Sequence, residues 1–369
     1  KIVAAGSGFP AQVRPLDFAL ARYNRDGTLD STFGDGGKVL TTFEPNSIDG
    51  ANAVVIQPDG KIVAAGSTRT GPTREFAVAR YLPNGSLDAS FDRDGLVVTP
   101  ISAGIVFDVA VQPDGKLIAA GWSNPGGFDI AMARYNPDGS LDASFGGGGI
   151  VVPSSFRPAS TYADHVLVLR DGKILTGGTG LVRFNSDGSV DRSFGAGGRA
   201  ATDLGLVTPV LQPDRKIIAA GSTQASGQFS DFGVVRLTAG GRIDSTFGRS
   251  GKVTTDFRPQ DDATDAALLA IGKLIVSGYT SQVPFEAPAD FAIARYVAIR
   301  FCVVAAVRGE KLAAARTRLV RANCRLGKVT RSYSPTVRRG RVISHRPRVG
   351  SRLAELAKVD LVVSRGKRR

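Results

Sequence analysis

Hydrophobic and polar residues alternate in short runs along the first three hundred residues, with turn residues between the runs. The clearest stretch has an apolar run at 53–57, then Pro-Asp-Gly, then a second apolar run at 61–66. Asp-Gly between two apolar runs predicts a tight hairpin, because glycine adopts positive φ and aspartate tolerates it. Residues 76–81 alternate with a period of two, which predicts a third strand, and residues 96–99 predict a fourth.

This four-strand pattern recurs six times, and two landmarks locate the copies. A lysine opens the second strand of each copy: Lys1, Lys61, Lys116, Lys173, Lys216 and Lys273. An arginine closes the third strand: Arg22, Arg80, Arg134, Arg183, Arg236 and Arg295. Four strands in about 40–60 residues predict a β-propeller blade, whereas a linear solenoid usually has shorter repeats and needs polar capping units. Small residues at the end of each Lys-Ile-Val-Ala-Ala-Gly run are expected where strands crowd near the propeller axis.

The first and last copies are incomplete. The first lacks its innermost strand, because the chain opens at Lys1 inside a predicted hairpin and without Met, as expected of a fragment or a processed form. The last copy has no clear fourth strand. Residues 297–301 are one candidate for it, and a larger ring that has lost its N-terminal portion is the other interpretation.

The repeated phrase resembles the delta-60 repeat of bacterial surface and secreted proteins. The resemblance rests on DGKIVAAG, FAxARY and DGSLDxSFGxGG and covers residues 1–297. It implies an all-β fold, a β-propeller of about six four-stranded blades. It implies no shared active site.

The pattern changes at Cys302, where a short apolar strand and Gly309 precede a predicted amphipathic helix. Leu312, Ala315 and Leu319 share the apolar face of that helix, and arginines lie between them. Three further strands are predicted after it. This arrangement resembles a PASTA domain over residues 302–366, a small α+β module followed by a basic tail at 367–369. Residues 304–305 are Val-Ala where PASTA domains usually begin with Val-Pro.

The C-terminal module carries the positive charge of the chain. Residues 300–369 hold 20 Lys and Arg against 3 Asp and Glu, so the remainder of the chain is slightly acidic. PASTA domains are associated with peptidoglycan, so the resemblance implies contact with a cell-wall polymer, peptidoglycan or an anionic glycopolymer. The residues predicted to make that contact are Arg338, Arg339, Arg341, Arg346 and Arg348.

The same charge leaves two other interpretations open. Long-range attraction supports non-specific binding to phosphates. Only Phe301 and Tyr333 are aromatic in this region, however, so no platform for stacking bases is apparent and no specific nucleic-acid binding is expected. Solubility without any specific ligand is the third possibility.

The chain has two cysteines, Cys302 and Cys324, and they flank the strand and helix of the C-terminal module. A disulfide between them would tie the end of the helix to the first strand, and two reduced core thiols are the alternative. A disulfide implies an oxidising compartment, in agreement with an extracellular or cell-surface location.

Candidate sites in the repeats have simpler structural interpretations. Asn136, Asp138 and Asp142 look like part of a calcium loop but lack the ligand count of one, so a hairpin turn is expected. The repeated arginine either lines an anion-binding channel or, as we expect, pairs with the aspartate of Ser-Leu-Asp. His165 stands alone and is expected to be structural.

An acidic cluster and the absence of known motifs complete the survey. Asp261, Asp262 and Asp265 are expected to lie in a solvated linker without a metal. No catalytic triad, P-loop or dinucleotide motif is present, and no apolar run is long enough for a membrane span. No cofactor is expected.

The sequence therefore predicts a monomeric, non-enzymatic extracellular binding or scaffold protein. Its propeller would be displayed at the cell envelope, with the basic module in contact with the wall. The alternative is a carbohydrate-active propeller enzyme, a lyase or hydrolase, which would require clustered carboxylates at the mouth of the channel.

Overall fold

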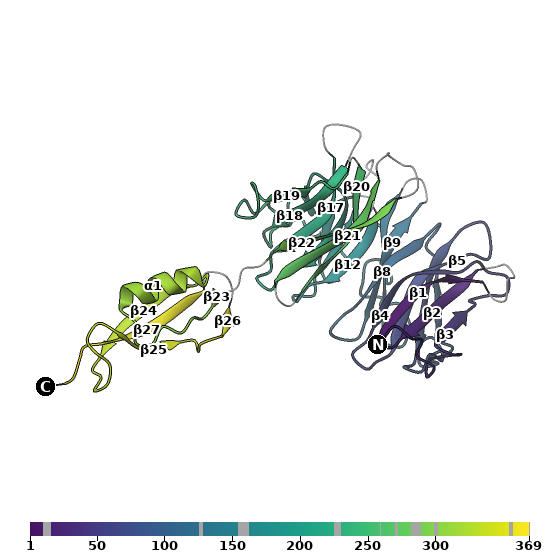
Figure 1. Cartoon of the computed structure of the whole chain (residues 1–369). Coiled ribbons are helices and arrows are strands. Elements are labelled where there is room, and N and C mark those ends of the chain that lie inside the picture. Colours follow the sequence, from purple (N-terminus) through teal and green to yellow (C-terminus); the bar gives the residue numbers. More distant parts are fainter. Residues whose placement is uncertain are drawn as a thin grey trace. The chain divides into compact units, whose positions relative to one another are not determined.

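A computed structural model of the chain describes residues 1–9, 16–124, 128–153, 162–224, 230–258, 260–269, 272–281, 289–298, 302–353 and 357–368. These residues form β-strands and one α-helix, α1 (Leu312–Arg321) (Figure 1). No helix in the described part of the chain has the length and apolar character needed to cross a membrane. The chain divides into two compact units, and the C-terminal module lies in the second of them.

The repeat strands form six sheets, one for each copy, which are the blades of a β-propeller. Blade 1 has β1 (Ile2–Gly8), β2 (Asp17–Tyr23) and β3 (Lys38–Thr41). Blade 2 has β4 (Gly50–Ile56), β5 (Ile62–Thr68), β6 (Glu75–Tyr81) and β7 (Leu96–Thr99). Blade 3 has β8 (Ile105–Val111), β9 (Leu117–Ser123), β10 (Asp129–Tyr135) and β11 (Ile150–Val151).

The later blades follow the same plan. Blade 4 has β12 (Ala163–Val168), β13 (Ile174–Gly178), β14 (Leu181–Phe184) and β15 (Arg199–Ala200). Blade 5 has β16 (Leu204–Leu211), β17 (Ile217–Gln224), β18 (Ser230–Leu237) and β19 (Lys252–Thr255). Blade 6 has β20 (Gln260–Leu268), β21 (Lys273–Ser281) and β22 (Asp290–Val297).

Four of the six blades have the predicted four strands, and the described residues give blades 1 and 6 three each. Val297 is the last residue of β22, not part of a further strand. The rest of the candidate fourth strand at 297–301 lies mostly outside the described residues, because residues 299–301 are not among them.

Hairpin turns set the register of each blade. In blade 2, Ile56 is opposite Ile62, and the backbone amide of Gln57 donates to the carbonyl of Lys61 at 2.8 Å. Gly60 has φ of 86° in this turn, a conformation that costs glycine little. The predicted Asp-Gly turn therefore forms because its glycine is free to adopt positive φ.

The same turn in blade 5 carries Arg215 in place of glycine, with φ of 67°. A side chain is strained in this left-handed region, typically by about 1 kcal/mol. We expect Arg215→Gly to raise the free energy of unfolding of the full chain by about 1 kcal/mol, measured by urea denaturation. The reciprocal control is Gly60→Arg, which should destabilise blade 2 by a similar amount. If both substitutions shift stability in the same direction, backbone strain is not the cause.

In blades 2 and 3 the two middle strands form the core. All seven residues of β5 are buried, and in β6 only Glu75 is partly exposed. The terminal glycine of the β5 run, Gly66, is required by a close approach, because a Cβ there would lie 1.9 Å from the carbonyl oxygen of Gly50 on the neighbouring strand. The small residue at the end of this run, Gly66, therefore allows the first and second strands of one blade to approach closely.

The C-terminal module is a small α+β domain. The α1 helix accompanies a three-stranded sheet ordered β24-β27-β25, in which β24 (Arg325–Ser332) runs parallel to β27 (Lys358–Ser364) and β25 (Val342–Arg346) antiparallel to it. A short pair, β23 (Cys302–Val303) and β26 (Arg352–Leu353), completes the domain. Its core includes Ala315 and Leu319 of the predicted apolar helix face.

Candidate functional site

In blades 1 to 4, one buried aspartate of the repeat receives both landmark residues. In blade 2, Asp88 lies 2.7 Å from the Nε of Arg80 and 2.9 Å from the Nζ of Lys61. Arg80 also lies over the ring of Phe91, with 4.5 Å from its guanidinium carbon to the ring centroid. The same arginine–aspartate pair forms in five blades: Arg22–Asp30, Arg80–Asp88, Arg134–Asp142, Arg183–Asp191 and Arg236–Asp244. The arginines therefore serve the repeat itself, as expected of pairing with Ser-Leu-Asp.

The same arginine reaches into the next blade. Nη1 of Arg80 donates to the backbone carbonyl of Pro137 at 2.6 Å, and the amide of Asp92 donates to the carbonyl of Asp138 at 2.7 Å. Arg22, Arg134 and Arg183 make the equivalent contacts to Pro83, Ser186 and Ala239. In these four repeats the arginine therefore links two neighbouring blades. Arg295 has no equivalent, since no Ser-Leu-Asp segment follows it in the sequence.

A pocket opens where the first strands of blades 2 to 6 come together, and we call it the inner-strand pocket. It is lined by Asn52, Phe107, Trp122, Phe128, Tyr162, Asp164, His165, Leu206, Thr208 and Thr264. Three first strands are interrupted by a one-residue bulge, and the bulged residues are Asn52, Phe107 and Asp164. Bulges re-aim side chains, and here all three bulged residues line the pocket.

Hydrogen bonds link neighbouring first strands around the pocket. The Nδ2 of Asn52 donates to the carbonyl of Val106 at 2.8 Å, and Asp108 accepts the amide of Val166 at 2.8 Å. His165 Nε2 lies 2.9 Å from the hydroxyl of Thr208. This hydrogen bond links His165 to the next blade, which agrees with the structural role expected for this histidine.

Burial changes the acid–base properties of these groups. Burial raises the pKa of Asp164 to about 6. Burial also raises the pKa of Asp108 to about 6, although hydrogen bonds from two backbone amides act to lower it. Burial lowers the pKa of His165, which nearby Asp265 partly offsets, so the imidazole is held neutral at pH 7.

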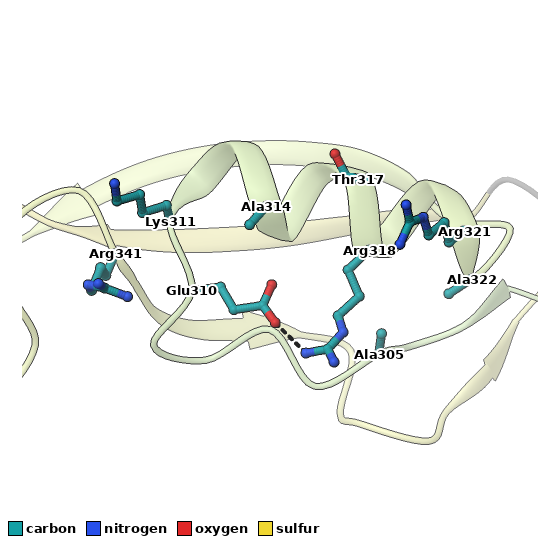
Figure 2. Close-up of a pocket in the computed structure, with 9 residues that line it drawn as sticks. All are labelled: Ala305, Glu310, Lys311, Ala314, Thr317, Arg318, Arg321, Ala322 and Arg341. Carbon is teal, nitrogen blue, oxygen red and sulfur yellow. Dashed lines mark hydrogen bonds and ion pairs between the residues drawn. The ribbon is translucent and has the colours of Figure 1, made fainter.

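A second candidate site is a shallow groove on the C-terminal domain, between α1 and the loop that precedes it. Lys311, Arg318, Arg321 and Arg341 line it, with Glu310 as the single acidic residue. Figure 2 shows Arg318 turned toward Glu310, with which it forms an ion pair, while Lys311 and Arg321 lie toward opposite ends of the helix. Arg341 donates to the carbonyl of Gly309 at 2.7 Å, so the groove keeps a net positive charge.

The two cysteines of this domain are joined. Cys302 and Cys324 form a disulfide with Cα atoms 4.6 Å apart, and both are buried in the domain core. The bond ties β23 to the segment after α1, the place predicted from the sequence. Of the two interpretations left open above, the disulfide is the one that the structure contains.

Family comparisons agree with both parts of this architecture. Residues 1–33, 57–91, 112–145, 169–194 and 212–247 match a domain of unknown function described as the DUF5122 beta-propeller, the delta-60 repeat family. Residues 303–365 match the PASTA domain. The chain is a delta-60 repeat β-propeller protein with a C-terminal PASTA domain. No curated protein matches it significantly.

Solved structures resemble the chain distantly. A periplasmic gluconolactonase of Pseudomonas aeruginosa has 14% identity and a TM-score of 0.48, with 80% of this chain and 82% of that chain covered. A protein of unknown function from Dyadobacter fermentans has 14% identity and a TM-score of 0.41, covering 62% and 75%. The arabinanase of Bacillus subtilis has 12% identity and a TM-score of 0.38, covering 66% and 92%. Similarity this low says nothing about the chemistry of the present chain.

The arginines predicted to contact the wall are spread over the PASTA domain. Arg341 lines the groove, whereas Arg338, Arg339, Arg346 and Arg348 are exposed elsewhere on the domain. The structure adds three basic residues to Arg341 in the groove: Lys311, Arg318 and Arg321. The sequence did not predict these three as contacts. Arg318 and Arg321 are three residues apart in the helix, and this spacing could have placed them on one face of it.

The acidic cluster of the repeats is not a linker. Asp261, Asp262 and Asp265 all belong to strand β20, and Asp261 is fully buried. Its Oδ2 accepts the backbone amide of Phe257 at 2.6 Å. The expectation of a solvated linker was therefore wrong. The carboxylates of Asp231, Asp256 and Asp261 do approach one another within 4.8 Å.

The calcium-like segment is a hairpin turn. Asp138 accepts the amide and the hydroxyl of Ser140 at 3.0 and 2.6 Å, and Asn136 donates to the same hydroxyl. Asp142 is engaged by Arg134 and Lys116. Protein donors therefore occupy the carboxylates, in agreement with the turn interpretation.

Proposed function

We propose that this protein is a non-enzymatic extracellular binding protein, monomeric, whose PASTA domain holds the propeller at the cell wall. The supporting observation is the positively charged groove beside α1. Its four basic side chains outnumber the one acidic side chain, Glu310, which Arg318 already neutralises. Peptidoglycan or another anionic wall polymer is the partner that this charge and the PASTA family both favour.

The location is supported by the disulfide. Such bonds persist in oxidising compartments and are rare where glutathione keeps thiols reduced. The net charge also suits a wall partner, because a dense positive field increases the rate of encounter with an anionic polymer. Within the described residues, Lys311 and Arg321 form no ion pair, so their charges are available to such a polymer.

The alternative, a carbohydrate-active propeller enzyme, requires a pair of carboxyl groups free to exchange protons with a substrate. Asp108 is occupied, since its two oxygens accept the amides of Val109 and Val166 at 2.8 Å. Asp265 accepts the amide of Ala266 and is exposed. Of the three described carboxyl groups in the region of the inner-strand pocket, Asp164 alone accepts no hydrogen bond from a described residue, which favours binding over hydrolysis.

The experiment is sedimentation of the full chain with insoluble peptidoglycan over a series of salt concentrations. We expect Lys311→Glu with Arg321→Glu to weaken binding by about tenfold or more, because each basic residue near an anionic surface contributes about 1 kcal/mol. The matched control is Arg338→Glu with Arg339→Glu, which makes the same change in net charge outside the groove and should weaken binding less.

Three results would contradict the proposal. The full chain could stay in the supernatant at low salt, or the two double variants could lose affinity equally. Binding could also be as strong to duplex DNA and vanish at modest salt, which would make the domain a generic polycation. Turnover of nitrophenyl glycosides by the purified protein would favour the enzyme instead.

A further inference from the structure

Two polar side chains that line the inner-strand pocket, Asn52 and Thr208, already form hydrogen bonds within the protein. The amide group of Asn52 donates to Val106, and the hydroxyl of Thr208 is shared with His165 and the carbonyl of Thr264. Asp164, at the bulge of β12, forms no hydrogen bond or ion pair with any described residue. The pocket therefore contains a carboxylate that no described donor engages.

Aromatic rings surround that carboxylate. Trp122 and Phe128 meet edge to face with 4.6 Å between ring centroids, and Phe107 and Tyr162 complete the apolar lining. Aromatic faces attract cations, and the attraction increases when the cation loses its water. Phe128 is 41% exposed, a large apolar side chain left uncovered at the pocket.

The charge around the pocket is negative. Asp108, Asp164 and Asp265 lie in this region, and neither lysine nor arginine is among the lining residues. An anionic ligand would meet only like charge. A neutral sugar would leave the carboxylate of Asp164 without a countercharge, and burying an unpaired charge is costly.

We propose that the inner-strand pocket binds an organic cation, an ammonium group seated against Asp164 with its carbon skeleton on Trp122 and Phe128. This ligand class uses the open carboxylate, the aromatic rings and the lack of basic residues together. The inference goes beyond wall binding and does not depend on it, because the pocket lies wholly in the propeller and the groove in the PASTA domain.

Binding should depend on pH. The pKa of Asp164 is raised by burial to about 6, so its charge is lost as pH falls from 7 to 5. The titratable groups around the pocket are Tyr162, just before β12, His165 on β12, Asp108 on β8 and Asp265 on β20. Protonation of Asp164, Asp108 or His165 makes the pocket less negative, so these contributions have the same sign and affinity for a cation falls on acidification.

The single tryptophan of the chain, Trp122, is a reporter inside the pocket. The test is titration of the full chain with n-butylammonium while the fluorescence of Trp122 is followed at pH 7. Sodium butyrate, n-butanol and N-acetylglucosamine serve as anionic and neutral probes. We expect a saturable change with n-butylammonium, little change with the other three, and about a tenfold or greater loss of affinity in Asp164→Asn.

Further variants separate the effect of Asp164 from a general change in charge. Asp203→Asn removes an exposed carboxylate outside the pocket, and asparagine tolerates its φ of 53°, so its affinity should equal that of the unmodified chain. Phe128→Ala should weaken binding without altering charge. If Asp164→Asn unfolds, the decrease in affinity between pH 7 and pH 5 replaces it. Saturable binding of N-acetylglucosamine but not n-butylammonium, equal affinity in the two Asp→Asn variants, or affinity independent of pH would each overturn the proposal.

Discussion

Replacing Arg80 by alanine is expected to lower the free energy of unfolding of the propeller by about 3 kcal/mol, the largest effect of any single substitution considered. The side chains of Arg80 and Asp88 are only 4% and 6% exposed. The substitution leaves a buried carboxylate with one partner fewer, uncovers the ring of Phe91 and removes the donor to the carbonyl of Pro137 in the next blade. Denaturation in urea, followed by circular dichroism, measures the loss.

The matched control is Arg192→Ala, because Arg192 is exposed in blade 4 and forms no ion pair with a described residue. Its effect should lie within about 0.5 kcal/mol of zero. A double-mutant cycle with Asp88→Asn separates the ion pair from the lost packing, because the pair contributes only when both partners are present. Equal stability of Arg80→Ala and Arg192→Ala would show that the joint does not stabilise the propeller.

The loss of stability caused by Arg80→Ala should become smaller at acidic pH. Burial by itself raises the pKa of Asp88, but hydrogen bonds from Lys61 and Ser90 and the charge of Arg80 outweigh it and hold the pKa well below its usual range. A carboxyl with a depressed pKa in the folded state stabilises the fold above its unfolded pKa, and this contribution is lost as pH falls further. The penalty of Arg80→Ala should therefore be full near pH 7 and shrink below about pH 4.

Removing the disulfide is the second large effect. Cys302→Ala with Cys324→Ala should destabilise the PASTA domain by about 3 kcal/mol, because the bond spans 22 residues and restricts the unfolded chain. We expect the domain to melt earlier in the full chain while the propeller transition is unchanged. Limited proteolysis across a temperature series would place the first cleavage after residue 302.

Reduction offers an independent control. The unmodified chain in excess dithiothreitol should match the double variant, because both lose the same cross-link, whereas dithiothreitol should leave the double variant unaffected. A domain transition that stays at the same temperature in both would contradict a stabilising role for the bond.

The repeats were readable from the sequence because their signals are local. Asp-Gly turns, alternating strands and the repeating lysine and arginine landmarks lie within about 60 residues of one another. The pairing of Arg80 with Asp88 spans eight residues, so the expectation that it would form needed no knowledge of neighbouring blades. The contact from Arg80 to Pro137 spans 57 residues and was not predicted, because nothing local in the sequence indicates it.

The inner-strand pocket could not be predicted from the sequence either, because its residues come from distant parts of the chain. Its lining comes from five first strands and one further strand and loop, spread from residue 52 to residue 264. One-residue bulges turn Asn52, Phe107 and Asp164 toward it, and a bulge leaves no clear mark in an alternating pattern. His165 therefore looked solitary in the sequence, although Thr208 of the next blade is its partner.

What the sequence by itself determined is the repeat, its strand order, the basic C-terminal domain and the separation of charge between the two parts. These follow from periodicity and turn chemistry, which act over a few residues. Tertiary structure decided which polar groups are satisfied and which are left open. Asp261 became a buried acceptor and Asp164 an open carboxylate among aromatic rings, because the neighbours that set the burial and partners of a carboxyl come from distant parts of the chain.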